Sequence, residues 1–207
     1  MTSKSLEKFT KTIKRCETLV NTYIDLKERS ERDEISSPTK DIVRGAVVLA
    51  VSALDAYVTD VFAEKLVPYI KTYNPDDSLI KLLSEAGLNT KEALVLIRMD
   101  RPYRRIRTLI EKYYSKYTTQ KFEVIDKLFL QYHLKNITQN AANKSGKALI
   151  KRSVEILIER RHDIAHNGDY NNHGRINDIS EISVLRRIND LNTLVTMMDE
   201  IICKKIP

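Results

Sequence analysis

The stretch AVVLAVSALDAYVTDVF, residues 46–62, decides the fold class. Its first part, AVVLAVSAL at 46–54, is bounded by Arg44 and Asp55 and is too short to span a bilayer, which requires about 20 apolar residues. A helix that is apolar nearly all round is buried on several sides. The stretch therefore predicts a core helix, over about 38–71, that other helices surround.

Three further segments show the period of amphipathic helices. Apolar residues recur every three or four positions in 5–33, in 146–165 and in 179–203. Asp178 followed by Glu181 resembles a capping box at the start of the last segment. The loop NGDYNNHG, 167–174, is short, so the two segments that it joins are expected to be antiparallel partners. We predict an all-α fold, an up-and-down bundle of four principal helices.

The middle of the chain, 74–140, is less regular. We expect short helices near 78–86 and 121–132, and another that starts at Asn89-Thr90 after a break at Gly87. No internal repeat or strand pattern is visible. The chain is interpreted as a single domain over 1–207, with 74–140 as a helical insertion of small helices in the middle of the bundle.

Composition limits the class of protein and its partners. The 207 residues carry a net charge of +7, with a pI near 9.3, which favours an anionic partner. The only cysteines, Cys16 and Cys203, form no CxxC pattern, so neither a disulfide framework nor a cysteine zinc site is expected. The first twenty residues are charged throughout and resemble no signal peptide. These features predict a cytoplasmic protein without membrane association.

The segment ERRHDIAHNGD, 159–169, ends the third amphipathic run. On a helical wheel Arg161 falls in the middle of the apolar stripe, and Arg160 points well away from it. A charged residue on a burying face needs a partner, because an unpaired buried charge is costly. That partner is either an internal carboxylate, water reached by a snorkelling side chain, or an anion bound in a cleft.

His162 and His166 are four residues apart and share one helix face. This spacing is half of a zinc site, but the HExxH glutamate and a cysteine pair are absent, and only His173 remains as a third imidazole. Histidines at a helix end also suit the negative end of the helix dipole. We expect no metal and no cofactor.

These residues carry a family resemblance. VEILIERRHDIAHNG, 154–168, resembles the Arg-x4-His motif of the HEPN superfamily, with Arg161 and His166 as its ends. VLAVSALDAYVTDVF, 48–62, and INDISEISVLRRINDLNTLVTMMDEI, 176–201, resemble the second and fourth bundle helices of the RiboL-PSP type of HEPN domain. The resemblance covers about 1–72 and 146–203. His162 stands where this type more often has asparagine.

The resemblance implies a metal-independent endoribonuclease that acts as a homodimer with a composite active site. In such enzymes the ribose 2′-hydroxyl attacks the adjacent phosphate and leaves a 2′,3′-cyclic phosphate and a 5′-hydroxyl. Arg161 would bind phosphate and His166 would transfer a proton, with His162 as a supporting polar residue. Asp55 is a weaker candidate that could orient Arg161 or a histidine; its alternative role is a structural salt bridge.

The segment RMDRPYRRIRTLIEKYYSKY, 98–117, is strongly basic. Arginines bind phosphates and tyrosines stack on bases, so an RNA-binding arm is one interpretation. The alternative is a solvated basic face whose Ile106, Leu109 and Ile110 pack on the bundle. The RNA-binding candidates are Arg101, Arg104, Arg105 and Arg107, together with Arg160; Tyr103, Tyr113, Tyr114 and Tyr117 are the tyrosines available for stacking.

By analogy with the settings of such domains, we expect a role in a toxin–antitoxin or anti-phage defence system, with RNA as substrate and an antitoxin or defence-system protein as a further partner. One alternative is a catalytically silent HEPN bundle that binds RNA or a protein. Another is a small metal enzyme that uses His162 and His166.

Overall fold

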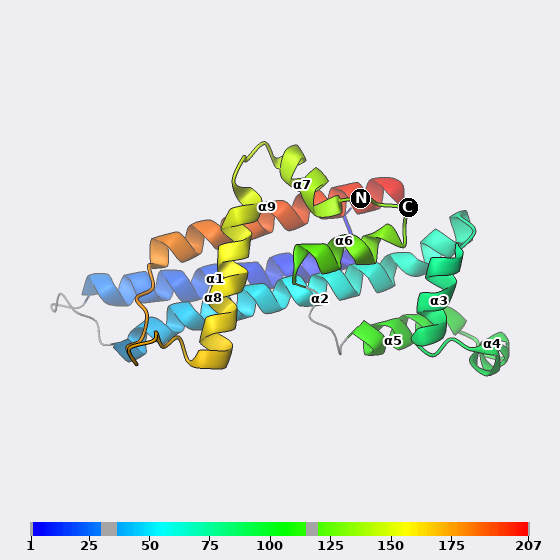
Figure 1. Cartoon of the computed structure of the whole chain (residues 1–207), viewed down its shortest axis with the longest axis horizontal. Helices are drawn as coiled ribbons and strands as arrows, with labels where there is room; N and C mark the ends of the chain where they lie inside the picture. The colour runs from blue at the N-terminus through cyan, green and yellow to red at the C-terminus, as the bar shows by residue number, and fades with distance from the viewer. Residues whose placement is uncertain (1, 30–36, 115–119, 207) are drawn as a thin grey trace.

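The computed structural model describes residues 2–29, 37–114 and 120–206, and within these ranges every regular element is a helix. The long ones are α1 (Lys4–Arg29), α2 (Asp41–Thr72), α8 (Ile150–Asn167) and α9 (Glu181–Lys205). The predicted all-α bundle with four principal helices is confirmed (Figure 1).

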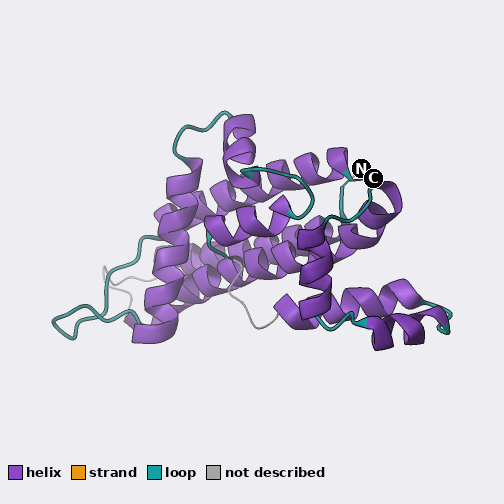
Figure 2. Ribbon diagram, turned by 45° about the vertical axis from the view of Figure 1, so that its right-hand side comes forward, coloured by secondary structure: helices purple, strands orange, loops and turns teal. Residues whose placement is uncertain are grey.

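The four long helices are not all aligned. α1, α2 and α9 lie side by side along the long axis, and α8 crosses them steeply (Figures 1 and 2). α8 does contact α9, as expected, but it is not an antiparallel partner over its length. The reason lies in the loop after α8, because Asp169 in this loop is tied to Arg44 on α2. The chain that follows α8 is therefore held against α2 before α9 begins.

α2 is the central helix of the core. It contacts α1, α5, α6, α8 and α9, and its buried side chains lie on all sides, among them Val47, Leu54, Val58 and Phe62. By length and composition α2 could cross a membrane, but 61% of its most apolar window is buried inside the protein, as in a core helix. A 3-10 turn, η1 (Ser37–Lys40), precedes it, so the α-helix begins three residues later than predicted.

Small helices fill the middle of the chain: α3 (Asp77–Glu85), α4 (Thr90–Ile97), α5 (Pro102–Tyr114), α6 (Phe122–Leu130) and α7 (Ile137–Ser145). The side chains of Asp76 and Asn89 cap α3 and α4 by accepting from the backbone N–H groups of Leu79 and Glu92. α3 and α4 project from one end of the bundle, whereas α5 and α6 contact α2 and α7 contacts α9 (Figure 2).

Two expectations about helix ends were wrong. α7 was not predicted, and its C-cap Gly146 delays the start of α8 to Ile150. The capping box at Asp178 does not form, because Ser180 is the N-cap of α9 and accepts from the Ser183 N–H at 3.3 Å. Asp178 instead forms an ion pair with Lys40 at 2.6 Å.

Candidate active site

The candidate motif occupies the C-terminal turns of α8. The helix stays regular through Asn167 and ends at Gly168, which has a φ of +60°. Glycine adopts this left-handed conformation without strain, as is common just after a helix. The N–H of Asp169 then donates to the carbonyl of Asp163 at 3.1 Å and closes the helix end. His166 therefore lies on regular helix and not on a frayed turn.

The first residue beyond this turn, Asp169, is completely buried. Its Oδ2 accepts from Arg44 Nε on α2 and from Arg160 Nη2 on α8, both at 2.7 Å. Arg44 also donates to the carbonyl of Asn177 at 2.7 Å. We call Arg44, Asp169 and Arg160 the Asp169 cluster. It connects α2, α8 and the loop before α9, and it gives each buried charge a partner.

The cluster corrects the expected direction of Arg160. Arg160 does not point away from the packed side of α8, because its Nη2 reaches Asp169 and the carbonyl of Asp178 at 2.9 Å. The loop after α8 folds back over this side of the helix, and a helical wheel cannot include such a loop. The guanidinium of Arg160 is therefore engaged within the protein.

Arg161 is placed differently from its neighbour. It is half-buried in line with the buried Val154 and Leu157. Its Nε, like that of Arg160, is buried without a hydrogen-bond partner, but Arg160 is held by Asp169 through its Nη2. Within the part of the chain that the structure describes, no carboxylate forms an ion pair with Arg161. An internal salt bridge therefore does not account for this arginine. A guanidinium in this setting can accept an anion from outside the protein.

The two motif histidines are exposed and lie next to each other. The ring centroids of His162 and His166 are 4.5 Å apart, as expected for positions one turn apart. No group of three His, Cys, Asp or Glu side chains that could hold a metal ion is found among the described residues. These imidazoles are accessible for proton transfer to a bound substrate.

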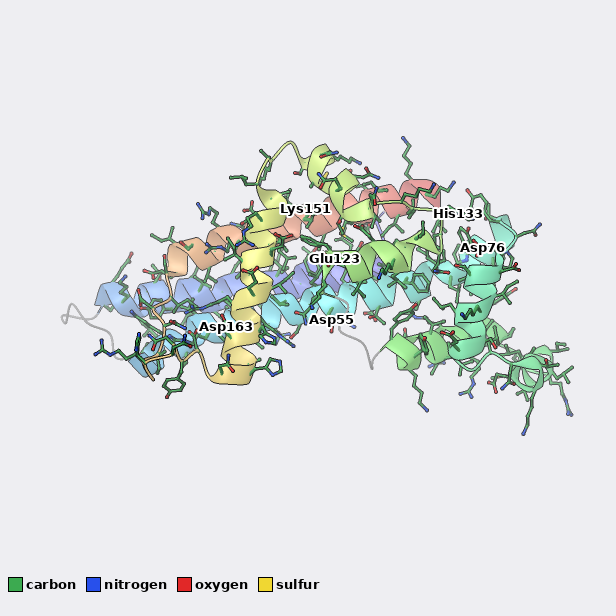
Figure 3. The ribbon with its side chains drawn as sticks, viewed as in Figure 1. Asp55, Asp76, Glu123, His133, Lys151 and Asp163 are labelled. Atoms are coloured by element: carbon green, nitrogen blue, oxygen red, sulfur yellow. The ribbon has the colours of Figure 1, made fainter. Side chains whose placement is uncertain are left out.

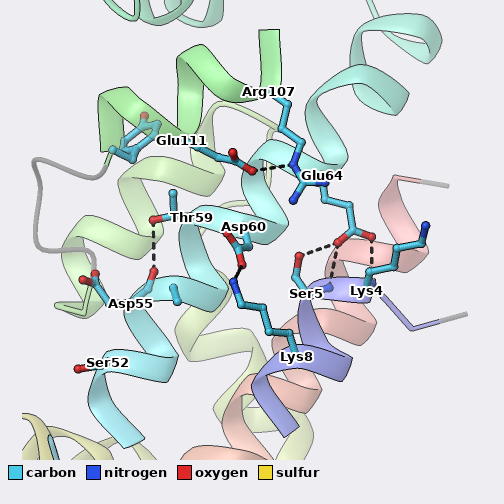
Figure 4. Close-up of a pocket in the computed structure, with 12 residues that line it drawn as sticks. Lys4, Ser5, Lys8, Ser52, Asp55, Thr59, Asp60, Glu64, Arg107 and Glu111 are labelled. Carbon is cyan, nitrogen blue, oxygen red and sulfur yellow. Dashed lines mark hydrogen bonds and ion pairs between the residues drawn. The ribbon is translucent and has the colours of Figure 1, made fainter. Parts of the chain in front are cut away.

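Asp55 lies elsewhere on α2, to one side of α8 (Figure 3). It is half-buried and lines a hollow between α1, α2 and α5, together with Ser52, Thr59, Glu64 and Arg107 (Figure 4). Asp55 has a partner of its own, and among the described residues no hydrogen bond or ion pair is found between it and Arg161, His162 or His166. The structure thus brings the two histidines together but does not bring Asp55 to them.

The basic segment lies on α5 and the turn before it. Its five arginines are exposed, and its Ile106 and Ile110 pack into the core, as the second interpretation expected. Arg105 forms an ion pair with Glu92 at 2.6 Å, and Arg107 forms one with Glu111 at 2.7 Å. RNA contact by Arg101, Arg104, Arg105 and Arg107 stays a prediction. Tyr117 lies outside the described residues.

The sequence reasoning missed Arg44 and Asp169. Arg44 was taken only as the boundary of the apolar stretch, yet its side chain is 6% exposed. A cation at the edge of a fully buried helix is itself a signal, because it requires a buried anion. Asp169 follows Asn-Gly and therefore suggested an exposed turn. Only its left-handed backbone, with a φ of +65°, places the carboxylate inside.

Comparison with known proteins adds one finding. A family model described as RiboL-PSP-HEPN matches residues 10–204. The match runs through 74–140, which the motif resemblance did not cover. No curated protein and no solved structure matches the chain.

Proposed function

The chain belongs to the RiboL-PSP-HEPN family, and from this premise we propose that it is a metal-independent endoribonuclease whose site is built on Arg161 and His166. The family supports a nuclease or RNA-binding role in general. The cleavage chemistry, the homodimer and the biological setting are our proposal.

One observation carries the proposal: two adjacent arginines have opposite environments. Arg160 is bound within the Asp169 cluster, whereas Arg161 has no anionic partner and lies one residue before the exposed His162. An unpartnered guanidinium that is half-buried costs stability. A bound phosphate would compensate this cost by accepting hydrogen bonds from the guanidinium.

The residues suit cleavage by the ribose 2′-hydroxyl. An imidazole takes the proton of the 2′-hydroxyl as the oxygen attacks phosphorus. The bond from phosphorus to the 5′-oxygen breaks, and that oxygen receives a proton from a second imidazole. Arg161 stabilises the negative charge that grows on the phosphate oxygens in the transition state. The products are a 2′,3′-cyclic phosphate and a 5′-hydroxyl.

The geometry of α8 favours a site shared between two copies of the chain. Five residues separate Arg161 from His166, so on a regular helix they point about 140° apart. Because α8 is regular through Asn167, fraying does not bring them together. A two-fold axis would place Arg161 of one protomer beside His166 of the other. We therefore propose a homodimer with two composite sites.

The test is RNA cleavage by purified protein in excess EDTA, with several single-stranded and structured RNAs. Arg161→Ala and His166→Ala should each lower the rate at least about a hundredfold. Arg152→Ala, an exposed arginine on the same helix, and His173→Ala, an exposed histidine in the following loop, are the matched controls and should keep activity. The product ends should carry cyclic phosphate. Equal cleavage by all variants, or none by the wild type, would point to the silent binding bundle instead.

Mixing the two inactive variants tests the composite site. Random pairing of Arg161→Ala with His166→Ala should restore about one quarter of the wild-type rate, because half of the dimers are mixed and each of these has one intact site. A site within one protomer would gain nothing from mixing. The molar mass in solution, measured in parallel, shows whether the dimer forms.

We also propose, by analogy, that this activity restricts RNA in the cytoplasm in a toxin–antitoxin or anti-phage system. Expression in a bacterial host should slow growth, and expression of His166→Ala should not. An antitoxin or other defence-system protein would then restrain the nuclease. Equal growth with both proteins would remove the support for a toxic role.

A further inference from the structure

An unusual number of large apolar side chains are exposed on α4 and on the turn into α5. Leu94 is 61% exposed, Ile97 is 80% exposed, and Val95, Met99 and Tyr103 are also exposed. α4 buries only Leu96. α4 projects from the bundle end that lies away from α8 (Figures 1 and 2). A cluster of this kind, which solvent disfavours, is typical of a surface that binds a partner.

The same surface carries cations that the protein does not neutralise. Arg98, Arg101 and Arg104 are exposed, and none forms an ion pair with any residue in the described ranges. They line a surface hollow together with Met99, Asp100, Arg105 and Thr108. Residues 94–104 therefore combine apolar side chains with unpaired guanidinium groups. We call this surface the tip.

We propose that the tip binds an acidic amphipathic helix of a partner protein. Leu94, Val95 and Ile97 would pack against the apolar face of that helix. The carboxylates beside that face would pair with Arg98, Arg101 and Arg104, which gives the contact its charge specificity. This inference goes beyond the proposed nuclease function and does not depend on it.

Two other occupants fit the tip less well. RNA would satisfy the arginines, but bases stack on aromatic rings and not on branched aliphatic side chains. Within the tip the exposed aromatic ring is that of Tyr103, and Lys71 Nζ lies over it at 4.7 Å from its centroid. A second copy of this chain, joined through the tip by a two-fold axis, would bring the unpaired arginines of both protomers together, and like charges oppose such a contact.

The experiment is a selection from a displayed library of helix-forming peptides of about 20 residues, or about five turns. The full chain is the bait, and Ile97→Ser and Arg101→Glu serve in counter-selection. Ile182→Ser is the matched control, because Ile182 is also an isoleucine that is largely exposed, at 73%, but lies at the start of α9. Both isoleucines are exposed, so neither substitution should unfold the protein, which thermal unfolding checks.

The expected result is enrichment of peptides that repeat leucine or isoleucine at helical spacing with Asp and Glu beside them. Their affinity should fall at least about tenfold with Ile97→Ser and with Arg101→Glu, and should stay unchanged with Ile182→Ser. Enriched peptides that bind all variants equally, or no enrichment, would overturn the proposal. Two further results would overturn it if no peptide is enriched. One is binding of anionic phosphatidylglycerol vesicles that is lost with Ile97→Ser. The other is binding of an RNA oligonucleotide that is lost with Arg101→Glu.

Discussion

Among the residues that the structure describes, two carboxylates are completely buried, and they are held in different ways. Asp169, beside the end of α8, accepts from two guanidinium groups. Asp199, on α9 near the chain termini, accepts from neutral donors: the backbone N–H of Ser3 at 3.1 Å, the Ser3 hydroxyl, and the Tyr57 hydroxyl at 3.2 Å. The first carboxylate is neutralised by charge and the second is solvated by hydrogen bonds. The two should therefore respond differently to mutation and to pH.

The largest expected effect is on the Asp169 cluster. Asp169→Ala leaves the buried Arg44 with only the exposed carboxylate of Asp41 and should lower the free energy of unfolding by about 3–5 kcal/mol. Asp199→Ala removes an acceptor from neutral donors and should cost less, about 1–3 kcal/mol. Urea unfolding of both variants measures the difference, with the exposed Glu159→Ala as control. If Asp199→Ala costs more than Asp169→Ala, the comparison is reversed.

The next effect separates the two arginines of the motif. Arg160→Ala removes a charged hydrogen bond to Asp169 and should lower the free energy of unfolding by about 1.5–3 kcal/mol. Arg161→Ala removes a half-buried guanidinium that has no ionic partner and should not lower the free energy of unfolding. Thermal and urea unfolding measure both. A large loss with Arg161→Ala would reveal a structural partner and weaken the proposed phosphate site.

Of the two buried carboxylates, Asp199 is the one beside a tyrosine whose pKa is raised, so alkaline pH should affect its surroundings. Burial, and then the nearby Asp199 carboxylate, raise the pKa of Tyr57 well above its usual value. The folded state then keeps a proton that the unfolded state loses above about pH 10, so stability present below that pH is lost as pH rises.

The variant Tyr57→Phe tests this difference. Above about pH 10, the free energy of unfolding should fall less steeply in Tyr57→Phe than in the wild type, by about 1.4 kcal/mol per pH unit. Urea unfolding between about pH 9 and 11.5 gives the slopes, since this range spans the usual tyrosine pKa. Tyr132, whose pKa burial also raises, is present in both proteins and does not alter the comparison. Identical slopes would show that Tyr57 does not contribute.

The smallest expected effect is on an ion pair at the surface. Lys27 donates to Glu181 at 2.7 Å, and this hydrogen bond lowers the pKa of the Glu181 carboxyl. The stability it gives is present above the usual glutamate pKa and is lost as pH falls through the lowered one. Because Lys27 is exposed, Lys27→Met should cost much less than Asp169→Ala at pH 7 and nothing at pH 2. Chemical unfolding at both pH values measures it; a cost near that of Asp169→Ala would contradict the comparison.

The sequence predicted what depends on local pattern. The four long helices, the breaks at Gly87 and Gly168 and the position of Arg161 on the apolar stripe follow from helical periodicity and glycine conformation. α7 was missed because its residues ITQNAANKS are mostly polar, and Asp126, twelve residues earlier, binds the Thr138 N–H at 2.9 Å. The Asp169 cluster joins residues 125 positions apart, and no local period records such a pair.

The steep crossing of α8 has a mechanical consequence. α8 meets α2 around Leu157, which lines one small pocket together with Val47. Arg161 lies about 6 Å and His166 about 13 Å beyond this point along the helix axis. A tilt of about 10° at the crossing would move His166 by about 2 Å and Arg161 by about 1 Å. The C-terminal part of α8 is held to α2 by the contact between Asp169 and Arg44. A ligand that weakened this contact would let α8 rotate about the crossing point, and His166 would then move about twice as far as Arg161.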